Sequence, residues 1–322
     1  MGRGSGDYIV KRVAFGLVTV FVAVTVNFVL FRALPGTAVS NLSQVPRASP
    51  ELKAALEKEF GLDRPKWQQY GLYLDQLVHG NLGISYDNQR PVSENLAGAV
   101  RNTVPMAALG LVVAIALGIL VGTLSAWRRG TRLEHLSSAI TVTLFSVPAQ
   151  WVGLILLIVF AGVLPSGGIR SPFLIGATSW GRLTDEFRHM VLPSLTLAMT
   201  LYGGYALVVR SALLESLGED YMLTARAKGL PPRIILRTHA LRNAMLPTIT
   251  MIALSAGRIV TGYILVETVF SWPGVGRAIY QAVLQRDYPM LQGAFLLLTV
   301  TVVLCNLAAD VAYARLDPRV GG

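Results

Sequence analysis

The chain has 322 residues, of which 53% are hydrophobic and only 14% are charged, and its formal net charge is +10. Soluble domains carry about 25% charged residues, so this composition excludes an ordinary soluble protein. The positive charge falls mostly in segments that the positive-inside rule assigns to the cytosol, so we expect no nucleic-acid partner.

Six apolar stretches are each long enough to cross the hydrocarbon core of a bilayer, which takes about 20 helical residues. In chain order, these predicted transmembrane helices are residues 13–34, 102–127, 136–164, 190–210, 244–266 and 290–310. An all-α, polytopic membrane protein is predicted, because a helix satisfies its own backbone polar groups in lipid. The third stretch is longer than a perpendicular span needs, so we expect tilt or a kink at Pro148.

The charges between the stretches orient the chain. Segments 1–12, 128–134, 210–242 and 310–322 hold 14 Lys and Arg against 7 Asp and Glu, which favours a cytosolic position for both termini. The first stretch is too long for a secretory signal and no small-x-small cleavage site follows it, so we expect it to be retained. The predicted cytoplasmic termini are 1–12 and 311–322, and the predicted extracytoplasmic loops are 35–101, 165–189 and 267–289.

The long outer loop 35–101 is predicted to be a helical cap. Within residues 49–60, Ser49 suits an N-cap, Pro50 suits the first helical position, and Gly61 ends the pattern. Leu52, Ala55, Leu56 and Phe60 fall on one face of that helix.

No motif in the chain points to catalysis. There is no GxxxxGK[ST] phosphate-binding loop and no HExxH motif, the only cysteine is Cys305, and the four histidines lie in separate loops. We therefore expect no catalytic residue, metal site or cofactor in this chain.

One basic residue lies near the centre of the fifth predicted span. Arg258 shares a helical face with Ser255, Thr261 and Gly262. Intramembrane charge is costly, so such a residue usually faces a bundle interior or a water-filled cavity. These four residues are candidates for a translocation pathway in which Arg258 attracts a substrate carboxylate. The alternative is that Arg258 pairs with an acidic residue or with carbonyls of a neighbouring helix.

A charged, proline-marked cytosolic segment, residues 216–243, separates the fourth and fifth spans. Its residues 221–228 are compatible with a helix, Gly229 permits a turn, and Pro231-Pro232 fits the start of a second helix. Arg226 and Lys228 offer charged contacts to a partner surface or to anionic lipid. The alternative is a basic loop that only fixes topology.

The order of residues in this segment is specific. Residues 221–230, YMLTARAKGL, and 239–244, HALRNA, resemble the cytoplasmic EAA loop of binding-protein-dependent ABC importer permeases. Further motifs, LPG at 34–36, VETVFSWPGVGR at 266–277 and LDPR at 316–319, narrow the resemblance to the B-type permease subunit of the peptide/nickel (oligopeptide and dipeptide) family.

This resemblance implies a type I ABC importer permease fold whose coupling helix docks on a cytosolic ATPase. The matching positions at that contact are Tyr221, Thr224, Ala225, Arg226, Ala227, Lys228, Gly229 and Leu230. Leu223 replaces the Glu of the general motif, and Arg258 occupies a position that is usually neutral. The implied partners are a second homologous permease, two ATPases that bind Mg-ATP, an extracytoplasmic binding protein and membrane lipid.

The resemblance also implies a function and a location. The expected activity is ATP-driven import of short peptides across a prokaryotic inner membrane by alternating access, with ATP hydrolysis on the partner subunits and not on this chain. The alternatives are import of nickel chelates or of another small solute, a stand-alone channel or secondary transporter, and a structural or assembly factor.

Overall fold

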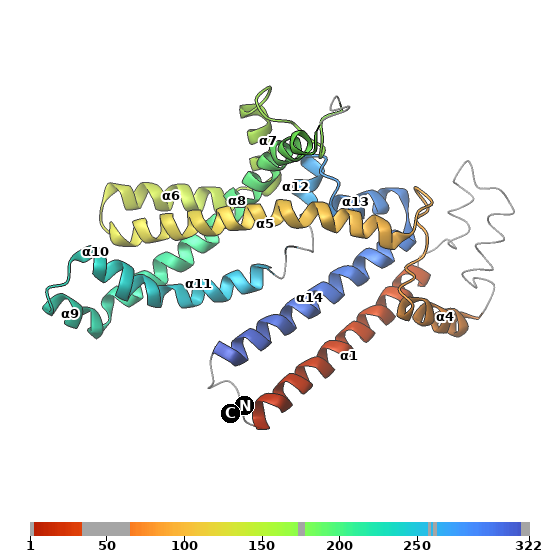
Figure 1. Cartoon of the computed structure of the whole chain (residues 1–322), viewed down its shortest axis with the longest axis horizontal. Coiled ribbons are helices and arrows are strands. Elements are labelled where there is room, and N and C mark those ends of the chain that lie inside the picture. Colours follow the sequence, from red (N-terminus) through yellow and green to blue (C-terminus); the bar gives the residue numbers. More distant parts are fainter. Residues whose placement is uncertain (1–2, 34–64, 173–177, 257–258, 260–262, 317–322) are drawn as a thin grey trace. The chain divides into compact units, whose positions relative to one another are not determined.

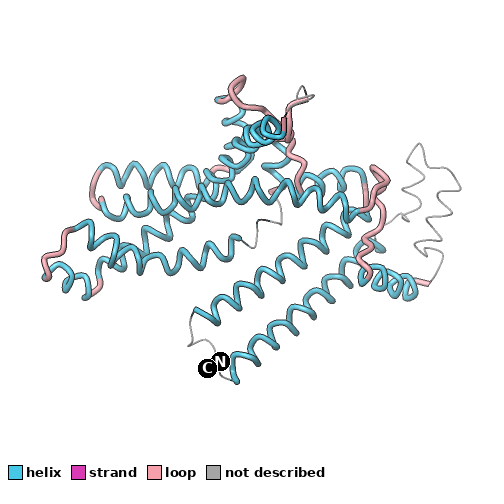
Figure 2. Tube along the Cα trace, in the orientation of Figure 1, coloured by secondary structure: helices cyan, strands magenta, loops and turns pink. Residues whose placement is uncertain are grey.

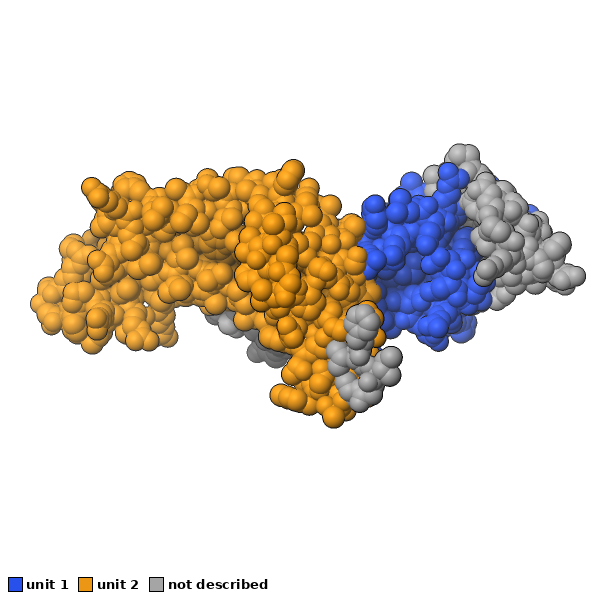
Figure 3. Space-filling model, turned by 90° about the horizontal axis from the view of Figure 1, so that it is seen from above, with its two compact units in different colours: residues 1–101, 274–322 blue, residues 102–273 orange. Residues whose placement is uncertain are grey.

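The computed structural model describes residues 3–33, 65–172, 178–256, 259 and 263–316 (Figure 1). The predicted outer helix 49–60 and three candidate pathway residues, Arg258, Thr261 and Gly262, lie outside these ranges. The described residues form helices and loops without a strand, apart from one antiparallel bridge between Ile84 and Pro91 (Figure 2). The chain divides into two compact units, residues 1–101 with 274–322 and residues 102–273 (Figure 3).

Unit 1 is built on two long apolar helices that run side by side (Figure 1). Its helices are α1 (Arg3–Ala33), α4 (Lys66–Val78), the first turns of α5 (Val92–Trp127), α13 (Val275–Gln285) and α14 (Tyr288–Leu316). The Asn27 side chain of α1 donates to the Gln292 carbonyl of α14 at 3.0 Å. Phe31 packs its ring against those of Tyr288 and Phe295. This hydrogen bond and these ring contacts fix the two helices along one another.

A buried carboxylate caps the start of α14. Asp287 is 1% exposed, and its side chain accepts from the Met290 N–H at 3.2 Å and from the Ser85 hydroxyl at 2.5 Å. The first bond is that of an N-cap residue to the third helical position, which satisfies one of the free N–H groups at a helix start. The second bond attaches the loop between α4 and α5 to the same point.

Unit 2 is organised around α8 (Ser179–Gly218), a helix of 40 residues. Three other helices of the unit, α6 (Arg132–Ser146), α7 (Ala149–Val159) and α11 (Leu241–Ala256), pack against it. The part of α5 in unit 2 also lies on α8, because a Cβ added at Gly118 would be 2.3 Å from the Tyr205 Cβ. Gly118 and Gly122 have the small-xxx-small spacing that allows such close contact.

The third predicted span, residues 136–164, contains a sharp bend. Helices α6 and α7 meet at 107° across Val147 and Pro148. Proline lacks an N–H and pushes the residue before it into an extended conformation, and Val147 has φ −78° and ψ 129°. The break lies at Pro148, where a kink is one of the two expected accommodations of the excess length.

A buried carboxylate also joins α12 to the part of α5 in unit 2. Glu267 in α12 (Ile264–Val269) is fully buried and accepts from the Thr103 hydroxyl at 2.8 Å. The Trp272 indole N–H donates to the Asn102 carbonyl at 3.1 Å, and the Asn102 side chain donates to the Pro273 carbonyl at 2.8 Å. Residues 267–273 are thereby fixed to the start of the second predicted span.

The described helices account for four membrane spans, or five if the bent pair is one span. The four are in α1, α5, α8 and α14, each long and apolar enough to cross a bilayer. In the fifth predicted span, 244–266, α11 has 16 residues, or about 24 Å at 1.5 Å per residue, which is less than the ~30 Å hydrocarbon core. The predicted number of six spans therefore stays a prediction.

Candidate coupling site

Residues 216–243, named here the coupling element, form a helical hairpin after α8 (Figure 1). The element contains α9 (Asp220–Ala227), the short α10 (Pro232–Ile234), the π-helical segment η1 (Ile235–Ala240) and the start of α11. Gly229 has φ +72°, and its N–H donates to the Arg226 carbonyl at 2.9 Å. Pro232 occupies the first position of α10, where its fixed φ suits a helix. The predicted turn and the predicted start of the second helix are confirmed.

One face of α9 is packed against the rest of the chain. Met222 and Ala225 are buried in a cluster with Leu213 of α8, Ala240 of η1 and Ala126 of α5. The small Ala225 side chain lets α9 approach this cluster closely. Ala225 contacts the chain's own core, so it supports the packing of α9 from its buried face.

The opposite face of α9 and the turn that follows are open to solvent. Of the eight residues predicted to contact an ATPase, Ala225 is buried, Leu230 is half-buried, and the exposed ones are Tyr221, Thr224, Arg226, Ala227, Lys228 and Gly229. Leu223, which replaces the Glu of the general motif, is 64% exposed. This surface is therefore both apolar and basic, because it contains the exposed Leu223 together with Arg226 and Lys228.

A serine that the sequence did not single out holds the hairpin to α8. The Ser216 hydroxyl lies 2.6 Å from the Tyr221 hydroxyl of α9 and donates to the Ala240 carbonyl of η1 at 3.2 Å. The bond from Ser216 to the Ala240 carbonyl is buried, and a hydrogen bond in such a setting is stronger than in water. The bond to Tyr221 is only partly buried. No sequence pattern marks Ser216, because its partners are defined only by how the hairpin folds back.

The exposed charges of the coupling element are segregated. Glu219 and Asp220 stand at the start of α9. The basic residues follow, and all are exposed: Arg226, Lys228, Arg233, Arg237 and Arg242. None of these side chains forms an ion pair within the part of the chain that the structure describes. The basic end of the element is therefore available to an acidic surface or to anionic lipid.

Of the four candidate pathway residues, the structure describes only Ser255. Ser255 lies near the end of α11 and is half-buried. Arg258, Thr261 and Gly262 are outside the described residues, so their shared helical face stays a prediction.

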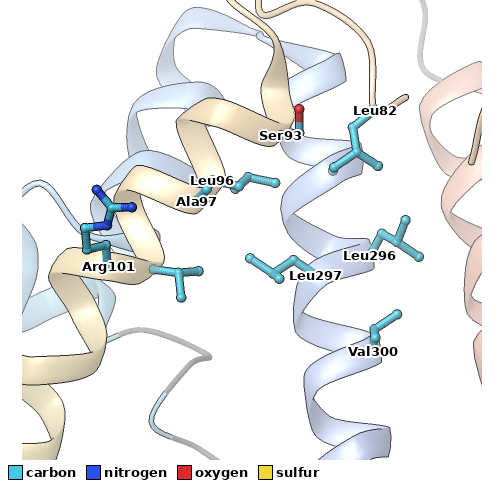
Figure 4. A pocket seen from close by; sticks show the side chains of 10 residues that line it. Leu82, Ser93, Leu96, Ala97, Arg101, Leu296, Leu297 and Val300 are labelled. Carbon is cyan, nitrogen blue, oxygen red and sulfur yellow. The ribbon is translucent and has the colours of Figure 1, made fainter. Parts of the chain in front are cut away.

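An apolar groove lies in unit 1 between the start of α5 and α14, with a volume of about 580 Å³ (Figure 4). Its only polar lining side chains are Ser93 and Arg101, and the other lining residues are Leu82, Leu96, Ala97, Val100, Gly293, Leu296, Leu297 and Val300. The polar backbone of a peptide would find too few hydrogen-bond partners there. We assign no part of the translocation pathway to this groove.

Within the described ranges, no three His, Cys, Asp or Glu side chains come together as metal ligands. The exposed face of the coupling element suits mechanical contact with a partner. The family model of the binding-protein-dependent transport system inner membrane component matches residues 114–322, and the model of its N-terminal region matches residues 6–107. The chain belongs to this family of ABC importer permeases. It is thus a permease subunit and a multi-pass protein of the inner membrane.

Relatives of this permease match it from end to end. The dipeptide transport system permease protein DppB of Escherichia coli strain K12 is 36% identical over 334 residues, which cover 98% of each chain. The di/tripeptide transport system permease protein DppB of Pseudomonas aeruginosa is 33% identical over 330 residues, again covering 98% of each. The glutathione transport system permease protein GsiC of Escherichia coli O6:H1 is 35% identical over 317 residues, with the same coverage.

Proposed function

We propose that this permease imports short peptides as one of two nonidentical membrane subunits of an ABC importer. The observation that carries the proposal is the match of 33–36% identity over 98% of the chain to permeases named for dipeptide and di/tripeptide transport. A relative named for glutathione, itself a small peptide, extends the same substrate class.

The coupling element is the proposed contact with the ATPases. Its exposed α9 face and its rigid attachment to α8 support this role, since a docking helix transmits movement only if it is firmly held. Two cytosolic ATPases that bind Mg-ATP would press on this surface as they close. The permease pair would then alternate between inward-facing and outward-facing states, and an extracytoplasmic binding protein would deliver the peptide.

The proposed orientation has both termini in the cytosol. It rests on the 14 basic against 7 acidic residues of the inner segments, and it places the coupling element on the side where ATP is available.

Purification of the tagged chain from its native membrane tests the proposal directly. We expect an ATPase and a second permease to copurify, and proteoliposomes of the complex to take up a labelled dipeptide only when binding protein and Mg-ATP are present. Uptake that needs no ATP would overturn the proposal in favour of a channel or secondary transporter. ATP-driven uptake of a nickel chelate that excess dipeptide does not inhibit would overturn the peptide assignment and leave the machinery in place.

A further inference from the structure

The inner turn between α5 and α6 is held by a buried carboxylate. Glu134, in the first turn of α6, is 6% exposed and forms an ion pair with Arg210 of α8. Its second carboxylate oxygen accepts from the Gly130 N–H at 2.6 Å. The Glu134 N–H in turn donates to the Thr131 hydroxyl, which caps α6, at 3.4 Å. One side chain therefore joins the turn 128–131 to α8.

The same stretch of α8 holds the coupling element. Arg210 lies six residues, or about 9 Å along the helix, before Ser216, which bonds to α9 and η1. Between them, the fully buried Leu213 packs in one cluster with Met222 of α9 and Ala126 of α5. The α5–α6 turn and the coupling element thus lie at one end of unit 2 (Figure 1) and are both attached to the last turns of α8.

We propose that Glu134 and Arg210 are positioning residues for coupling, which make the α5–α6 turn move with α8 when the coupling element is displaced. The inference rests on the proposed function, because it assumes that an ATPase displaces this element. The third predicted span continues from α6, and no residue of α6 belongs to the cluster that packs against the hairpin, so the ion pair extends the movement to that span.

The chemistry of the pair suits that role. Glu134 is buried, whereas the Arg210 side chain is 32% exposed. Separating the pair leaves the buried carboxylate without its charged partner, which is more costly than losing an ion pair between two exposed side chains. The Glu134 carboxylate also retains a backbone donor from the turn, so the connection resists both sliding and rotation. If apolar side chains met at this point instead, α6 and α8 could slide past each other by small distances at little cost in free energy.

Conservative variants of the assembled complex test the inference through the ratio of peptide imported to ATP hydrolysed. Glu134→Gln removes the charge but keeps an acceptor for Gly130, and Arg210→Lys keeps the charge but loses the guanidinium fork. For Glu134→Gln we expect ATP hydrolysis to stay within about twofold and uptake per ATP to fall at least about fivefold, the lower end of typical coupling between sites. For Arg210→Lys we expect a smaller fall in uptake per ATP.

The double variant Glu134→Gln with Arg210→Gln removes both charges. We expect it to lose no more coupling than Glu134→Gln alone, because both substitutions remove the same interaction, so that their effects are not additive, and because Arg210 no longer leaves an unpaired charge. Exposed neighbours provide matched controls: Arg132→Gln on α6 and Glu215→Gln on α8 should leave the ratio unchanged.

The melting temperature and subunit content of each purified complex separate coupling from folding. A purely structural role would lower uptake and ATP hydrolysis in parallel with the amount of complex, and that result would overturn the inference. An unchanged ratio in intact Glu134→Gln complexes would overturn it as well. If no ATPase copurifies with the unmodified chain, the proposed function itself fails, and this result is distinguishable from both.

Discussion

At the scale of single residues, the turn of the coupling element depends on Gly229. This residue has φ +72°, a left-handed conformation that costs other L-residues about 1–2 kcal/mol. A Cβ built at Gly229 would meet no atom within 4 Å, so the demand for glycine comes from the backbone and not from space. The sequence motif alone identifies the position, and the structure supplies the reason for it.

Replacing Gly229 with Asp is expected to separate assembly from transport. Asp tolerates the left-handed region better than most residues, so the fold should survive at a cost of about 1 kcal/mol. The new carboxylate would stand beside Lys228 on the proposed ATPase surface and should abolish ATP-driven uptake while the protein remains in the membrane. Gly80→Asp is the matched control, since Gly80 has φ +74° and equally open space. Normal uptake by Gly229→Asp vesicles would count against the coupling assignment.

At the scale of elements, close packing of α5 on α8 depends on the absence of a side chain at Gly118. A Cβ there would lie 2.3 Å from the Tyr205 Cβ and 3.1 Å from the Tyr202 carbonyl oxygen, and neither atom belongs to the far end of a flexible side chain. Any larger residue must push the two helices apart. This affects a long contact, because both helices cross unit 2.

We therefore expect Gly118→Leu to lose the folded protein, with little material left in a monodisperse peak after extraction in mild detergent. Overpacking of this kind typically costs about 1–3 kcal/mol, and here it is the helix axes that must move. Gly98→Leu on the same helix serves as control, because a Cβ at Gly98 would meet nothing within 4 Å. Equal yields of Gly118→Leu and Gly98→Leu would show that α5 and α8 are packed less closely than in the structure.

The sequence predicted those features of the elements that depend on local chemistry. A kink at Pro148 is one of two expectations for the third span, and the bend lies there because proline acts through its own backbone. The sequence did not reveal the bond between Ser216 and Tyr221 or the ion pair of Glu134 with Arg210. Glu134 and Arg210 are 76 positions apart, and only the packing of α6 on α8 makes them neighbours.

At the scale of the whole molecule, apolar length predicted the membrane class but not the form of every crossing. Residues 136–164 have enough apolar residues for one helix, yet two helices at 107° share them, because hydropathy averages over a break that the backbone at Pro148 imposes. The family follows from residue order over the full chain, which composition does not contain. Relatives named for a dipeptide and for glutathione match the chain at 36% and 35% identity, so overall identity does not distinguish between their named cargoes.

The orientation of the molecule decides which of these surfaces can meet an ATPase, and cysteine labelling measures it. In a Cys305→Ser background, which removes the only cysteine, we introduce Ser179→Cys at the start of α8 or Thr238→Cys in η1, both at exposed positions. An impermeant maleimide should label Ser179→Cys in right-side-out vesicles and Thr238→Cys only in inverted ones, because the twofold excess of basic over acidic residues favours a cytosolic position for the coupling element. The cysteine-free background must stay unlabelled in both preparations. The reverse pattern would place the coupling element on the side without ATP and would contradict the proposed transport cycle together with the orientation.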